Sequence, residues 1–164
     1  MRRTLAGLIL AISFLVAWPA PANPIRGRPQ VVLDELAFPD DVSGGAAYKQ
    51  HLRKTLAREA RHADWGAGRK NRIEYRFYVT ELVIEERGDA LQVRCTALGK
   101  LPKGKRAKSH LAFSGEKSQR SELVRRVLDI VAKGVITRLA ELERVRRGDL
   151  KENGVRRVEL VGPE

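Results

Sequence analysis

Hydrophobic and polar residues recur with two different periods along the chain, and these periods predict its secondary structure. A period of two, typical of a strand with one buried face, runs through residues 31–38, 72–86, 91–98 and 107–113. A period near 3.6, typical of an amphipathic helix, runs through residues 46–64 and 118–146. A short apolar stretch at 154–161 adds a last strand. The predicted order is β-α-β-β-β-α-β, an α+β fold in which two amphipathic helices pack on a mixed or antiparallel sheet.

Interruptions of the pattern refine this prediction. Ser43 is the expected N-cap of the first helix, because its side chain can accept a hydrogen bond from a free backbone N–H. The apolar phase of residues 72–86 changes near Thr80 and Glu81, which predicts a β-bulge there. Gly134 lies in the middle of the second helix, where glycine costs about 1 kcal/mol relative to alanine. We therefore expect the helix to approach a strand closely at Gly134.

The first 22 residues have the three parts of a secretory signal peptide. Arg2 and Arg3 supply positive charge, residues 5–18 are apolar and uncharged, and small residues precede a cleavage site predicted after Ala22. The apolar run is shorter than the about 20 residues that a membrane-spanning helix needs. A lipoprotein would carry a cysteine at the cleavage site, whereas the only cysteine is Cys95. The pattern predicts a cleaved signal and a periplasmic or secreted protein, with twin-arginine export as an alternative route.

The charge of the remaining chain narrows the class of partner. Cleavage would leave a flexible lead-in at 23–30 and a single α+β domain at 31–164. The whole chain has a net charge of +12, and the signal carries two of the 32 basic residues and none of the 20 acidic ones, so the remainder carries +10. Such a charge favours polyanionic partners, for example anionic lipid or cell-wall polymer. Nucleic acid is not expected as a partner, because the predicted address lies outside the cytoplasm.

Five basic residues gather around the turn between the third and fourth predicted strands. They are Lys100, Lys103, Lys105, Arg106 and Lys108. On a hairpin tip, such side chains can hold phosphate or carboxylate groups, which makes them the candidate anion-binding site. The alternative is a solvated loop that only keeps the protein in solution. The stretch lacks the interleaved aromatic residues of proteins that bind single-stranded nucleic acid.

Other chemistry-bearing residues do not form a recognisable set. Cys95 falls in an alternating strand pattern, so we expect a small buried hydrophobic side chain rather than a reactive thiol. His51 and His62 are three helical turns apart, about 16 Å of rise, and cannot share a metal ion. His110 lies on a different predicted element. No catalytic residue, metal site or cofactor is predicted, and a small enzyme is the last of three functional hypotheses.

The element order, together with the stretch Phe113, Ser114 and Gly115 leading into a long helix, resembles a group of bacterial envelope domains. The group includes the amino-terminal domain of TolB and the LpoB-type activators of penicillin-binding proteins. The resemblance implies a non-enzymatic periplasmic accessory module that contacts an envelope protein partner. The chain departs from the group in two ways, since it has no lipid-accepting cysteine and no propeller. The alternative function is direct binding of an anionic envelope polymer or lipid through the basic turn. The sequence leaves the oligomeric state open.

Overall fold

The computed structural model describes residues 27–66, 72–102 and 104–148. Its elements are β1 (Gln30–Ala37), α1 (Gly45–His62), β2 (Arg72–Arg87), β3 (Ala90–Lys100), β4 (Arg106–Glu116), a short 3-10 helix (Lys117–Gln119) and α2 (Arg120–Arg146). This order confirms the predicted α+β class and the first six of the seven predicted elements, and it adds the short 3-10 helix before α2. The predicted signal peptide, its cleavage site and the predicted strand at 154–161 lie outside the described residues.

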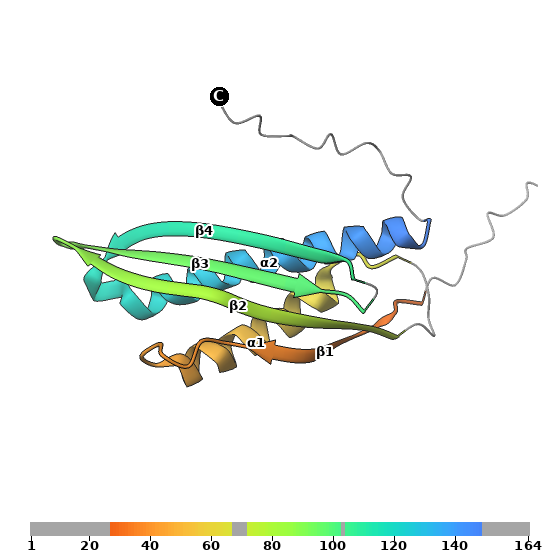
Figure 1. Ribbon diagram of the computed structural model, residues 1–164, viewed down its shortest axis with the longest axis horizontal. Helices are drawn as coiled ribbons and strands as arrows, with labels where there is room; N and C mark the ends of the chain where they lie inside the picture. The colour runs from red at the N-terminus through yellow and green to blue at the C-terminus, as the bar shows by residue number, and fades with distance from the viewer. Residues whose placement is uncertain (1–26, 67–71, 103, 149–164) are drawn as a thin grey trace, which may run out of the picture.

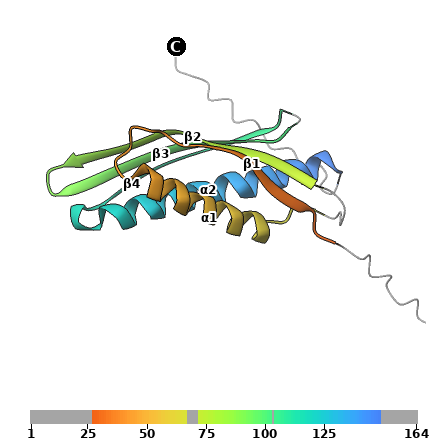
Figure 2. The same cartoon turned by 90° about the horizontal axis from the view of Figure 1, so that it is seen from below.

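The four strands form one mixed sheet in the order β1-β2-β3-β4. β1 pairs with β2 in parallel, and the other two pairs are antiparallel. Both helices lie on the same side of this sheet, side by side and roughly along the strands (Figures 1 and 2). The opposite side is not covered by any described helix or strand. We call it the open face.

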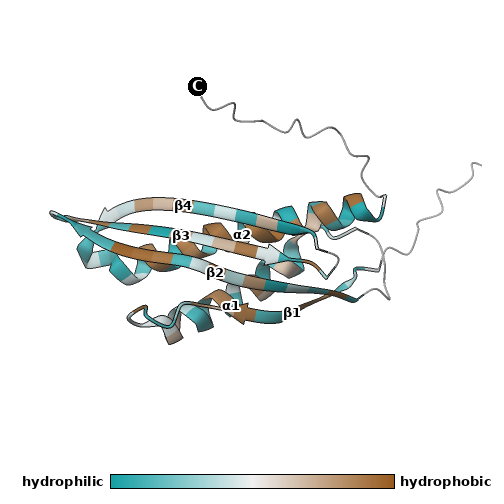
Figure 3. Ribbon diagram, in the orientation of Figure 1, coloured by the Kyte–Doolittle hydropathy of each residue, from teal (hydrophilic) through white to brown (hydrophobic). Residues whose placement is uncertain are grey.

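The core lies between the sheet and the two helices. Side chains along β2, β3 and β4 largely alternate between the core and the open face. Figure 3 shows that hydrophobic residues occur along the strands and along both helices. The largest fully buried side chains come from every layer and include Leu52, Leu56, Tyr75, Phe77, Leu91, Val93, Leu128, Ile136 and Leu139. Burial of each such side chain contributes roughly 1.5–3 kcal/mol to folding. The positions with helical or alternating spacing in the sequence are therefore those that fill the core.

Two irregularities keep apolar side chains directed at the core. The register of β2 against β3 shifts between Val79 and Glu81, which confirms the predicted bulge and turns Leu82 inward. A second shift, between Leu33 and Glu35, interrupts the pairing of β1 with β2. The sequence pattern did not identify this second bulge. One extra residue reverses the alternation of faces along a strand, so each bulge changes which later side chains reach the core.

Two glycines let α2 pack closely on the sheet. A Cβ atom on Gly134 would lie 3.3 Å from Ser109 Oγ on β4, which confirms the close approach expected there. A Cβ atom on Gly99 of β3 would lie 2.5 Å from Val135 Cγ1 and 2.7 Å from Leu139 Cδ1. These distances are too short for real carbon atoms, so the sheet and α2 meet at Gly99 without room for a side chain.

The start of α1 differs from the prediction. The N-cap is Gly44, not Ser43, and no side chain caps the helix. Gly44 has φ 77°, a left-handed conformation that glycine adopts readily, and it directs the chain into the helix one residue after Ser43. At the other end, α1 stops at His62 rather than near residue 64, and the Trp65 indole Nε1 donates a 2.9 Å hydrogen bond to Ala60 O.

Candidate anion-binding site

The candidate site lies at one end of the open face, where three basic residues stand side by side across three strands. The register places Arg76 of β2 opposite Lys100 of β3, and Lys100 opposite Arg106 of β4. Lys108 is two residues further along β4, opposite Leu98. Residues directly opposite on neighbouring strands point to the same face, so these cations share the open face. Like charges in such a row repel each other unless something neutralises them.

A cavity adjoins this row because β2 extends beyond the end of its neighbour β3. The pairing of β2 with β3 begins at Arg76 and Lys100, although β2 itself begins four residues earlier. After Lys100 the chain turns away toward β4, and Leu101 N donates to Lys105 O at 2.8 Å across the turn. Gly104 has φ 78°, which a side chain would disfavour, and it allows this tight reversal. The result is an open cavity of about 530 Å³.

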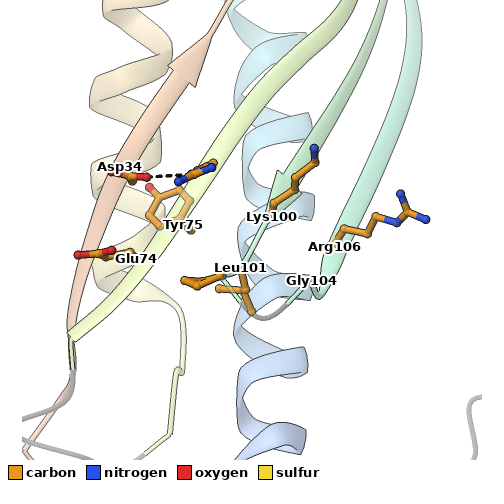
Figure 4. A pocket seen from close by; sticks show the side chains of 9 residues that line it. Asp34, Glu74, Tyr75, Lys100, Leu101, Gly104 and Arg106 are labelled. Atoms are coloured by element: carbon orange, nitrogen blue, oxygen red, sulfur yellow. Dashed lines mark hydrogen bonds and ion pairs between the residues drawn. The ribbon is translucent and has the colours of Figure 1, made fainter.

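The two sides of the cavity carry opposite charges. Figure 4 shows Asp34 and Glu74 on the side of β1 and β2, and Lys100 and Arg106 on the side of β3 and β4. Each carboxylate already has an arginine partner. Arg76 Nε lies 2.8 Å from Asp34 Oδ2, and Arg72 Nε lies 2.9 Å from Glu74 Oε1. The hydrogen bond from Arg76 to Asp34 also raises the pKa of Arg76. The acidic side is therefore neutralised within the fold.

The basic side is not neutralised in the same way. Lys100 Nζ lies 4.9 Å from the centroid of the Tyr78 ring, a cation–π contact that leaves its positive charge in place. The Tyr78 hydroxyl donates to Glu35 Oε2 at 2.8 Å, which fixes the ring under the lysine. Within the part of the chain that the structure describes, neither Arg106 nor Lys108 has an ion pair with a carboxylate. The site thus presents positive charge to solvent.

The structure corrects the shape of the predicted site. We predicted a hairpin tip, but Lys100, Arg106 and Lys108 lie in strands, and of the described cluster residues Lys105 alone belongs to the turn. Lys103 lies outside the described residues. Lys100 and Arg106 are brought together, as direct cross-strand partners. Arg76 was missed, because it is 24 residues before Lys100 in the sequence and only the strand register brings it into the row.

A second polar group lies further along the open face, around the buried Thr96 hydroxyl. This hydroxyl donates to Glu81 Oε2 at 2.9 Å and lies 2.8 Å from His110 Nδ1. A threonine hydroxyl has one proton, so His110 Nδ1–H must be the donor in the second contact. A nucleophile needs the opposite arrangement, in which its own proton points to a histidine nitrogen. Thr96 therefore joins β2, β3 and β4 and is not placed as a nucleophile.

The remaining chemistry-bearing side chains have structural partners. His51 Nε2 and Thr55 Oγ1 of α1 both contact Asp129 Oδ1 of α2, at 2.8 and 2.6 Å, and so join the two helices. Cys95 is fully buried, which confirms the prediction, and burial raises the pKa of its thiol to about 12. Over residues 27–66, 72–102 and 104–148, no group of three or more His, Cys, Asp or Glu side chains is arranged to hold a metal ion. No helix in these ranges is both long and apolar enough to cross a membrane.

No family model matches the chain, and no curated protein matches it. Among solved structures, it is similar to a minor lipoprotein from Acinetobacter baumannii, with 15% identity, 71% of this chain and 94% of that chain covered, and a TM-score of 0.41. It is also similar to a candidate lipoprotein from Caulobacter crescentus, with 10% identity, coverage of 72% and 92%, and a TM-score of 0.42. A PelC dodecamer from Paraburkholderia phytofirmans matches with 12% identity, coverage of 67% and 88%, and a TM-score of 0.39. The narrower resemblance to TolB and LpoB stays a prediction.

Proposed function

We propose that this protein is an exported, non-enzymatic binding module of the bacterial envelope that holds anionic groups of an envelope lipid or polymer. The observation that carries the proposal is the row on the open face, in which Lys100, Arg106 and Lys108 have no carboxylate partner among the described residues, although Arg76 beside them is paired with Asp34. A folded protein gains nothing from aligning like charges across strands, so a ligand of opposite charge is the simplest reason for the row. Arginine and lysine together suit phosphate and carboxylate groups.

The strength of such a site indicates a repeated ligand rather than a single small anion. Each exposed cation near an anionic surface contributes about 1 kcal/mol. Lys100, Arg106 and Lys108 together give about 3 kcal/mol, which corresponds to a dissociation constant of about 6 mM for one isolated group. A surface or polymer that offers many anionic groups raises the effective concentration and converts this weak contact into useful binding. Lipid head groups and acidic cell-wall polymers have this property.

An accessory role through contact with an envelope protein is the second candidate. It is favoured by the exposed edge of β4, which pairs only with β3 among the described residues. The two candidates differ in what they need. Binding to an anionic surface depends on salt and on the basic row, whereas a protein partner would be recovered at physiological salt in a fixed ratio.

Binding of the chain from residue 23 onward to vesicles across a salt series tests the proposal. Vesicles of phosphatidylglycerol with phosphatidylcholine should bind at low salt, and the affinity should fall steeply as salt rises. The triple variant Lys100→Ser, Arg106→Ser and Lys108→Ser should bind about a hundredfold more weakly, because three contributions of about 1 kcal/mol are lost.

A matched control removes the same charge from the other side of the molecule. Arg53→Ser, Lys54→Ser and Arg58→Ser change three exposed residues of α1, on the helical layer rather than the open face. This control should bind nearly as well as the unchanged chain. Equal weakening of both triple variants would mean that net charge alone drives binding, and the proposal would be wrong. Lipopolysaccharide as a second probe separates a polymer-like ligand from a phospholipid surface. Failure to bind either probe at low salt, with one envelope protein recovered in a fixed ratio from extract, would favour the second candidate.

A further inference from the structure

β4 forms an edge of the sheet, and its sequence is suited to pairing. It is 11 residues long and pairs only with β3 among the described residues. An edge strand leaves a row of backbone N–H and C=O groups without strand partners, and natural proteins usually protect it with charges, proline or a bulge. Residues 109–115, the middle of β4, contain no proline and no Asp, Glu, Lys or Arg. The pairing of β4 with β3 continues without a register shift.

α2 runs beside this edge, and two contacts fix their relative position. Gly134 faces Ser109, and Arg126 Cζ lies 5.6 Å from the centroid of the Phe113 ring. The eight helical residues between Arg126 and Gly134 rise about 12 Å, and the four strand residues between Ser109 and Phe113 span about 13.6 Å. Because these two lengths are similar, the midpoint of the α2 segment lies beside the midpoint of the β4 segment. Ile130 of α2 is therefore level with Leu111 in the centre of β4.

Exposed apolar side chains mark the same flank. Ile130 is 46% exposed and Phe113 is 39% exposed, and they are the exposed large hydrophobic residues found in the described part of the chain. One belongs to α2 and the other to β4. An open strand edge and an apolar helix face thus occur together on one side of the molecule, where a partner could contact both at once.

We propose that the partner is a second copy of this chain, which pairs antiparallel with β4 about a two-fold axis through Leu111. The axis is perpendicular to the sheet. An axis in this direction reverses the strand and keeps the core faces of the two copies on the same side of the joined sheet. This register pairs all 11 residues of β4. It places Arg106 opposite the partner's Glu116 at each end and puts no like charges opposite each other within the strand. Two four-stranded sheets become one sheet of eight strands.

The same axis brings the two α2 helices to a normal packing distance. α2 contacts β3 at Gly99 and β4 at Ser109, so we take its axis to lie between these two strands, about half a strand spacing from β4. The two-fold axis lies half a strand spacing beyond β4 on its other side. With strands about 4.8 Å apart, the two α2 axes would be about 9.6 Å apart, within the 8–10 Å typical of packed helices.

Side chains along α2 also fit this arrangement. Ile130 would meet the partner's Ile130 at the axis. Four residues away, Arg126 would lie opposite the partner's Gly134, where no side chain blocks it. Eight residues away, Glu122 would lie opposite the partner's Arg138, with opposite charge. Of the basic residues on the open face, only Arg106 takes part in the dimer contacts, and Lys100 and Lys108 do not. Measuring the dimer in buffer without polyanions therefore lets the dimer and the anion-binding proposal fail separately.

Sedimentation equilibrium of the chain from residue 23 onward, in buffer without polyanions, tests the dimer. Ile130→Arg places two like charges at the axis and should weaken the dimer at least tenfold. Gln50→Arg is the matched control, because it adds the same charge to an exposed position on α1, away from β4. Circular dichroism would check that both variants remain folded. Equal dimer affinity for the two variants would overturn the proposal.

A charge exchange tests the register itself. Arg106→Glu alone and Glu116→Arg alone each put like charges opposite one another at both ends of the strand pair, and each should weaken the dimer about tenfold. The double variant restores opposite charges and should recover most of the affinity. Two weakened single variants with no recovery in the double variant would exclude this register. A chain that stays monomeric at about 1 mM, a concentration at which even a dimer with a dissociation constant near 1 mM would be detected, would exclude the dimer altogether.

Discussion

Gly99 lies where β3 passes under α2, and Gly99→Ala introduces a methyl group into space that is already filled. Its Cβ atom would lie 2.5 Å from Val135 Cγ1 and 2.7 Å from Leu139 Cδ1, both well inside van der Waals contact. Val135 and Leu139 are fully buried, so neither side chain can turn away into solvent. Extra methyl groups in a packed core cost about 1–3 kcal/mol, and two simultaneous overlaps place Gly99→Ala in the upper part of that range.

Urea unfolding followed by circular dichroism measures this effect, and Gly134→Ala is the matched control. Gly134 also faces the sheet, but its new methyl would lie 3.8 Å from Ser109 Cβ, an ordinary contact, and 3.3 Å from the Ser109 hydroxyl, which can rotate away. Alanine in a helix gains about 1 kcal/mol over glycine, so Gly134→Ala should leave stability unchanged or raise it. In addition, Val135→Ala should cost less in the Gly99→Ala background than alone, because it removes one of the overlaps. A Gly99→Ala protein as stable as the unchanged chain would refute the close packing of α2 on β3.

Three further predictions concern the buried Glu143 carboxyl, the buried Cys95 thiol and the half-buried Asp129 carboxyl. Hydrogen bonds, chiefly from Arg146, lower the pKa of the buried Glu143 carboxyl below its ordinary value of 4.5. The charged Glu143 carboxylate therefore stabilises the fold at pH values above 4.5, and this stabilisation is lost as pH falls through the lower pKa of the folded protein. Glu143→Gln should lower the free energy of unfolding by about 2 kcal/mol at pH 7. In urea unfolding, the loss should become progressively smaller below about pH 4.5. Cys95, with its pKa raised to about 12, should resist a thiol reagent at pH 8 in the folded protein and react at once in denaturant; rapid reaction in the folded state would contradict its burial. Asp129→Asn should lower the thermal midpoint, because Asp129 holds both His51 and Thr55, and an unchanged midpoint would show that these contacts add no stability.

The fold could be predicted largely because its core positions repeat regularly. Alternation and helical spacing located six elements, and the phase change at Thr80 and Glu81 located the first bulge. Local backbone choices were harder to predict. Ser43 has the chemistry of an N-cap, but the left-handed Gly44 occupies that position, and the sequence does not distinguish these two starts. The second bulge, after Leu33, shows only once the pairing with β2 is known.

The candidate site could be predicted only in part, for a similar reason. Lys100 and Arg106 are close in the sequence, so a basic cluster was visible. The sequence predicted that both residues lie on a hairpin tip. In the structure the strands continue through Lys100 and Arg106 and place them directly opposite each other. Arg76 joins them through the register of two strands that are joined at their far end. Short-range patterns carry no information about such a register, and the same is true of the contact between Lys100 and Tyr78.

Residue-level mapping of anion binding tests the central claim most directly. Backbone amide signals of the chain from residue 23 onward would be followed by nuclear magnetic resonance during titration with a short-chain phosphatidylglycerol, at low and then at high salt. The proposed function predicts saturable shifts that concentrate at Arg76, Lys100, Arg106 and Lys108 and that disappear at high salt. Shifts spread evenly over the basic residues of both helices, or confined to α1, would contradict it, because they would show attraction to net charge rather than a site on the open face.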